Sequence, residues 1–65
     1  MNKTFDEMYA SLKSVRGNIY QILNTEFENG TITENRERLL IDMLSWLNYV
    51  KKNLDQYIQY CESAQ

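Results

Sequence analysis

The chain has 65 residues, with 7 Lys and Arg against 9 Asp and Glu, which gives a net charge of −2 at pH 7. A chain this short forms one small domain, and such domains usually need disulfides, a metal or a partner subunit for stability. One cysteine and no histidine exclude an internal disulfide and a structural zinc site. We therefore expect no metal and no cofactor, and association becomes the expected source of stability.

Charge and hydropathy exclude further classes of protein. The basic residues are scattered and form no stripe that could follow a phosphate backbone, so we expect no nucleic-acid partner. No apolar run is long enough to cross a bilayer, and the first residues lack the apolar segment of a signal peptide. We expect a cytoplasmic protein that is not associated with a membrane.

The first predicted element is a helix from about residue 5 to about residue 28. Thr4 followed by Glu7 matches a capping box at its start. Asn29-Gly30 marks its end, because glycine tolerates the left-handed conformation beyond a helix C-terminus. Gly17, on the side away from the apolar row, either admits another helix or is a tolerated surface glycine. Apolar residues recur along this helix at heptad spacing: Phe5, Met8, Leu12, Val15, Ile19 and Ile22.

A turn over residues 29–33 is followed by a second predicted helix, from about residue 34 to about residue 61. Two caps are possible at its start: Thr31 with Glu34, or Thr33 with the apolar Ile32 before it. Cys61 falls on the apolar row and is expected to be buried. The row of this helix has the same heptad spacing: Leu40, Met43, Leu47, Val50, Leu54 and Tyr57.

The two rows mirror each other about Thr31, so that one register pairs Phe5 with Tyr57 and Val15 with Leu47. This predicts an all-α fold, an antiparallel two-helix hairpin of the coiled-coil type, as a single domain over residues 1–65. The second helix also carries apolar residues on both flanks of its row, and a face this wide exceeds what one helix can cover. We therefore expect a homodimer in which two hairpins form a four-helix bundle.

The surplus apolar face predicts a non-catalytic protein-binding module that masks a partner surface by helix packing, as an inhibitor, adaptor or small chaperone. The size is also compatible with a bacterial or phage regulator. Aromatic residues are enriched among the residues that dominate binding energy. The predicted partner-binding residues lie on the second helix: Trp46, Tyr49, Leu44, Ile58 and Tyr60.

Acidic residues gather at the turn: Glu26, Glu28 and Glu34. Arg36 lies among them at an exposed tip, so the pattern favours a solvated charged surface, with recognition of a partner by charge as the alternative. The turn lacks the oxygen ligands and the final glutamate of a calcium-binding EF-hand loop, so calcium is not expected.

An enzymatic alternative comes from Asn53-Leu54-Asp55 on the second helix and Arg16 on the first. These residues resemble the small helical-hairpin phosphatases that dephosphorylate the aspartate of a response regulator. The second helix of that family carries Ser-Gln-Glu-Leu-Asp, of which only Leu54-Asp55 matches, and the spacing from Arg16 is longer here. The resemblance implies that Asn53 and Asp55 orient a water. In size, acidity and layout the chain is also similar to the small chaperones of type III secretion systems.

Overall fold

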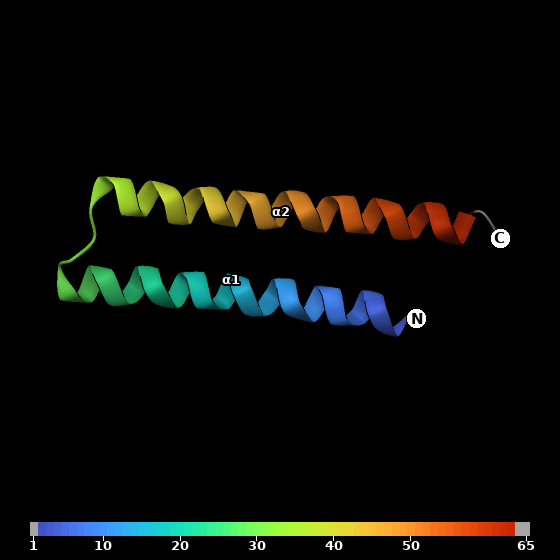
Figure 1. Ribbon diagram of the computed structural model, residues 1–65, viewed down its shortest axis with the longest axis horizontal. Helices are drawn as coiled ribbons and strands as arrows, with labels where there is room; N and C mark the ends of the chain where they lie inside the picture. Colours follow the sequence, from blue (N-terminus) through green and yellow to red (C-terminus); the bar gives the residue numbers. More distant parts are fainter. Residues whose placement is uncertain (1, 64–65) are drawn as a thin grey trace.

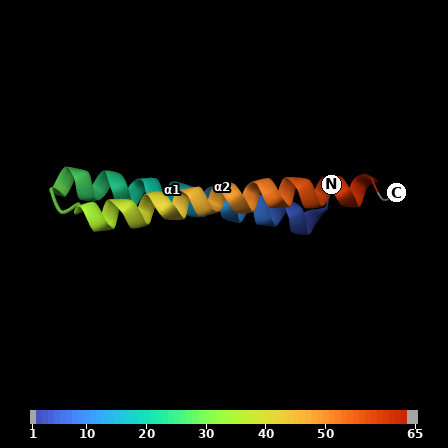
Figure 2. The ribbon, with the colours of Figure 1, turned by 90° about the horizontal axis from the view of Figure 1, so that it is seen from above.

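The chain forms two antiparallel α-helices joined by a short turn in a computed structural model, which describes residues 2–63 (Figure 1). Helix α1 spans Lys3–Asn29 and helix α2 spans Glu34–Ser63. The described residues contain no strand, which confirms the all-α hairpin. The helices cross at a shallow angle when seen from above (Figure 2), and the molecule measures 53 × 18 × 10 Å.

Helix α1 begins earlier than predicted, because Asn2 caps it in place of Thr4. The Asn2 side-chain oxygen accepts from the backbone N–H of Thr4 at 2.8 Å and of Phe5 at 3.3 Å. The capping-box prediction was therefore wrong. Asparagine is among the strongest N-cap residues, and its position lets the helix gain another half-turn of backbone hydrogen bonds.

The end of α1 is the predicted glycine stop. Gly30 adopts the left-handed conformation, with φ 68°. The N–H of Gly30 donates to the carbonyl of Phe27 at 3.2 Å, and the N–H of Thr31 donates to the carbonyl of Glu26 at 3.0 Å. This pair of bonds is the Schellman motif, which satisfies carbonyls that the helix leaves without partners.

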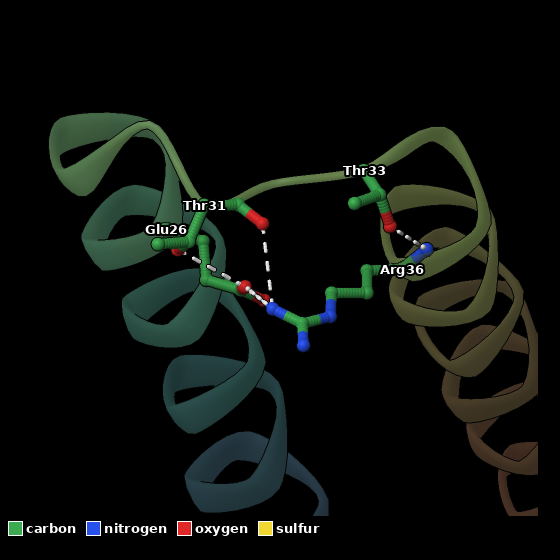
Figure 3. Close-up of polar contacts among 4 residues, drawn as sticks. All are labelled: Glu26, Thr31, Thr33 and Arg36. Atoms are coloured by element: carbon green, nitrogen blue, oxygen red, sulfur yellow. Dashed lines mark hydrogen bonds and ion pairs between the residues drawn. The ribbon is translucent and has the colours of Figure 1, made fainter.

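Thr33, rather than Thr31, caps helix α2. Its hydroxyl accepts from the N–H of Arg36 at 3.2 Å, and its carbonyl accepts from the N–H of Glu37 at 2.9 Å (Figure 3). Ile32 is half-buried just before the cap. Glu34 and Glu37 lie in the first turn, where carboxylates interact favourably with the positive end of the helix dipole.

The core of the single hairpin is small. Only Ile19, Leu40 and Leu54 are buried among the described residues, with 2%, 8% and 6% of their surface exposed. At the open end the rings of Phe5 and Tyr57 pack edge to face, with centroids 6.0 Å apart. This contact confirms the predicted register at that end of the hairpin.

Several residues of the two predicted apolar rows remain exposed in the structure. Among the half-buried residues, Tyr9 and Leu23 of α1 with Leu44 and Ile58 of α2 lie outside the predicted rows. The helices are thus rotated so that one flank of each turns inward. The exposed residues of the predicted rows are Met8, Val15, Ile22, Met43 and Tyr57. Cys61 is also exposed, so its predicted burial was wrong. The physical reason is that one neighbouring helix cannot cover so wide an apolar stripe.

Candidate protein-binding surface

One side of the hairpin presents an apolar face that draws on both helices. Heptad spacing puts residues seven apart on the same side of a helix. The exposed residues of the predicted α1 row therefore lie on one side of α1, and those of the α2 row lie on one side of α2. We define the apolar face as Met8, Val15 and Ile22 of α1 with Leu39, Met43, Trp46, Val50 and Tyr57 of α2. All of these side chains except Val50, which is half-buried, are exposed.

Two shallow grooves join the helices on this face. A groove of about 420 Å³ is bordered by Met8, Leu12, Val15 and Val50, and on one side by Thr4, Glu7 and Ser11. A second groove, of about 350 Å³, is bordered by Val15, Ile19, Leu39, Asp42, Met43, Trp46 and Leu47. Val15 lines both grooves, so the apolar surface is continuous along the hairpin. Such a surface has the shape that accepts an amphipathic helix.

An aromatic pair stands at the α2 edge of the apolar face. The rings of Trp46 and Tyr49 stack with centroids 5.6 Å apart and an angle of 25° between their planes. Trp46 is 64% exposed and Tyr49 is 57% exposed. Both residues were predicted to bind a partner, and the structure leaves both accessible.

The remaining predicted partner-binding residues lie in different surroundings. Tyr60 is exposed, and its hydroxyl accepts from the Gln56 side-chain amide at 3.4 Å. Leu44 and Ile58 are half-buried. Leu44 and Ile58 are therefore partly covered within the hairpin. Trp46, Tyr49 and Tyr60 are the exposed members of the predicted set.

The other side of the hairpin carries a smaller groove of about 190 Å³ with a basic rim. Leu12 and Leu47 border it, and each also borders one of the apolar grooves, so these leucines lie between the two sides. The cationic rim consists of Lys13 and Arg16 from α1 and Lys51 from α2. Tyr9 and Asn48 complete the lining.

Asp55 ties the two helices together beside this groove. The Tyr9 hydroxyl donates to Asp55 Oδ1, and Lys51 Nζ lies 3.3 Å from Asp55 Oδ2. The hydrogen bond from Tyr9, helped by Lys51, holds the pKa of the Asp55 carboxyl below its usual value. The same hydrogen bond raises the pKa of the Tyr9 hydroxyl. This contact was not predicted from the sequence, although Tyr9 and Asp55 lie close to mirror positions about the turn.

Of the three acidic residues predicted at the turn, one has polar partners within the hairpin. Glu26 Oε1 lies 2.7 Å from Arg36 Nη1 and accepts from the Thr31 hydroxyl at 3.3 Å (Figure 3). Arg36 also donates to the Thr31 carbonyl at 3.3 Å. Glu26 therefore joins α1 to the turn and to α2, whereas Glu28 and Glu34 remain exposed.

The residues of the enzymatic alternative are not held together as a pair by any described hydrogen bond. Asn53 is exposed on α2, and both carboxylate oxygens of Asp55 have partners in Tyr9 and Lys51. Across residues 2–63, no three His, Cys, Asp or Glu side chains gather closely enough to hold a metal ion. Neither described helix is both long and apolar enough to cross a membrane.

Comparisons with protein-family models, with curated proteins and with solved structures find no match to this chain. A function for this chain is therefore inferred from the surfaces of the hairpin alone.

Proposed function

We propose that this protein is a non-catalytic protein-binding module, an inhibitor, adaptor or small chaperone, that masks a partner surface by helix packing. The observation that carries the proposal is the apolar face, which extends over both helices of a chain with only three buried residues among those described. Exposed apolar patches of this extent mark interaction sites on soluble proteins. We place its action in the cytoplasm, where an exposed Cys61 thiol stays reduced.

We further propose that, while no partner protein is bound, a second copy covers the apolar face, so that two hairpins form a four-helix bundle. A compact monomer of 7.8 kDa exposes about 4,400 Å², whereas this chain exposes 5426 Å². The surplus of about 1,000 Å² is similar to the roughly 800 Å² that each partner buries in a standard interface. A two-fold dimer would satisfy both copies with the same face.

Sedimentation equilibrium tests the dimer directly. We expect roughly twice the 7.8 kDa chain mass at micromolar concentration. Val15→Asp should give monomers, because its carboxylate would be buried without a partner in the bundle. Ser14→Asp is the matched control: Ser14 is exposed and lies outside the apolar face, so this variant should remain dimeric. A folded wild-type chain that stays monomeric at about 100 μM would overturn the dimer.

Tyr49, whose ring stacks on Trp46 at the edge of the apolar face, then becomes the proposed contact with a different protein. Tyr49 is not part of the apolar face, and its removal leaves the hairpin core unchanged. Truncating an aromatic anchor typically costs about 2 kcal/mol or more of binding free energy. Tyr49→Ala should therefore weaken capture of the partner by about thirtyfold.

The measurement uses immobilised protein to capture partners from host extract, with mass spectrometry for identity and calorimetry for affinity. Tyr20→Ala is the matched control, because Tyr20 is 52% exposed on α1. Both variants should retain wild-type helicity by circular dichroism. Equal affinity of Tyr49→Ala and wild type for the captured protein would exclude this edge of α2 as the interface.

A further inference from the structure

The groove with the basic rim concentrates positive charge on an acidic protein. Lys13, Arg16 and Lys51 surround it, and none of the residues that line it is acidic. Asp55 contacts two of the lining residues, and its two oxygens already accept from Tyr9 and Lys51. Within residues 2–63, neither Lys13 nor Arg16 has an ion-pair partner. The rim thus keeps a net positive charge in a chain whose total charge is −2.

Arg16 lines the groove from a position between two half-buried residues of α1. Tyr9, Arg16 and Leu23 are spaced by seven residues, and the outer two are half-buried against α2. An arginine in such a row keeps its guanidinium in water and lays its aliphatic stem along apolar neighbours. The groove therefore combines a floor of Leu12 and Leu47 with a guanidinium at its mouth.

We propose that this groove binds carboxylate side chains of an acidic segment of another protein. Its volume of about 190 Å³ is below the roughly 300 Å³ at which pockets for drug-sized ligands begin, and it suits the end of one acidic side chain. The leucine floor fits the aliphatic stem of a glutamate. The planar guanidinium of Arg16 matches a carboxylate in two parallel hydrogen bonds. Lys13 and Lys51 supply positive charge from both helices.

This site lies across the Leu12–Leu47 layer from the apolar face, and so it goes beyond the proposed function. A second copy on the apolar face would leave the basic groove open. Failure of the dimer, measured by sedimentation, is therefore distinguishable from failure of acidic recognition, which is measured by titration.

The test is a titration of the ¹⁵N-labelled protein with a polyglutamate peptide at low salt, followed by NMR and calorimetry. We expect the largest shifts at Lys13, Arg16 and Lys51. Arg16→Gln should weaken binding by about tenfold, since a hydrogen bond to a charged group contributes that much at the lower end of its range. Lys51→Gln should also weaken binding. Lys52→Gln removes the same charge one residue away from the groove lining and should have little effect.

Three results would overturn the proposal. The first is an absence of shifts in the groove at millimolar peptide. The second is an equal loss of affinity for Lys51→Gln and Lys52→Gln, which would mean attraction by net charge alone. The third is equal or tighter binding of inorganic phosphate or a single-stranded oligonucleotide, which would mean that carboxylates are not selected. Circular dichroism of each variant checks that the hairpin is intact.

Discussion

At the scale of single residues, the two glycines of the chain have different backbone requirements. Gly30 has a φ of 68°, which residues with a Cβ adopt only at a cost. Gly17 lies within α1, and a Cβ built there meets nothing within 4 Å. The structure thus favours the interpretation of Gly17 as a surface glycine, since no other helix of the chain approaches it.

Alanine at these two positions should change stability in opposite directions. Gly30→Ala should lower the free energy of unfolding by about 1–2 kcal/mol, because alanine is strained in the left-handed region. Gly17→Ala should raise it by about 1 kcal/mol, because alanine is the better helix former. Urea denaturation followed by circular dichroism measures both. Destabilisation by Gly17→Ala would show that the position needs glycine for a reason outside the single hairpin.

The Tyr9–Asp55 hydrogen bond gives a prediction about acid stability. The pKa of Asp55 is lowered in the folded chain, so its contribution is present above the unfolded value near 3.8. That contribution is lost as the pH falls through the lower folded value. Tyr9→Phe should therefore move the Asp55 pKa upward and reduce the stability difference between neutral and strongly acid pH.

The carboxyl ¹³C shift of Asp55, followed by NMR from neutral to acid pH, measures the change. Tyr20→Phe serves as the control, because Tyr20 is exposed and has no hydrogen bond to Asp55 among the described contacts. If the Asp55 pKa were the same in Tyr9→Phe and in wild type, Lys51 alone would account for its low value.

At the scale of elements, each helix is defined by its ends and by one apolar row. Asn2 and Gly30 limit α1, and Thr33 begins α2. Each helix is long enough for several heptads, but among the described residues only Ile19 in the α1 row and Leu40 and Leu54 in the α2 row are buried. Ile19 is the most enclosed residue of α1, and we expect helix pairing to depend on it more than on its exposed neighbours.

Replacing isoleucine by alanine at a buried and at an exposed position distinguishes the core residue from a surface residue. Ile19→Ala should lower the free energy of unfolding by about 2–5 kcal/mol, because Ile19 is 2% exposed and its truncation leaves a cavity. Ile41→Ala should cost under about 1 kcal/mol, since Ile41 is 48% exposed on α2. Thermal and urea unfolding provide the comparison. Similar costs at the two positions would mean that the hairpin packs in a different rotation.

At the scale of the whole molecule, the hairpin has two unlike sides separated by the layer of Leu12 and Leu47. One side is apolar and continuous, and the other contains the basic groove. Packing of a second copy would use the apolar side, which includes Trp46, whereas the basic groove and Tyr49 would remain accessible to other proteins.

The sequence by itself determined the hairpin. Heptad spacing, the glycine after Asn29 and a threonine cap are local signals, and they predicted both helices, the turn and the pairing of Phe5 with Tyr57. The cap at Asn2 was not predicted, because Thr4 with Glu7 supplies a competing local signal two residues later. Trp46 and Tyr49 could be placed on an outer edge because their helical positions follow from the spacing alone.

Only the tertiary structure decided which flank turns inward. The rotation of each helix about its axis depends on the sum of many side-chain contacts, and a stripe wider than one neighbour allows more than one solution. This rotation half-buried Leu44 and Ile58, left Val15 and Met43 open, and brought Tyr9 to Asp55. It also assembled the basic groove, because Lys13 and Lys51 line it from two different helices. These residues are far apart in the sequence, so local sequence patterns could not predict that they share a groove.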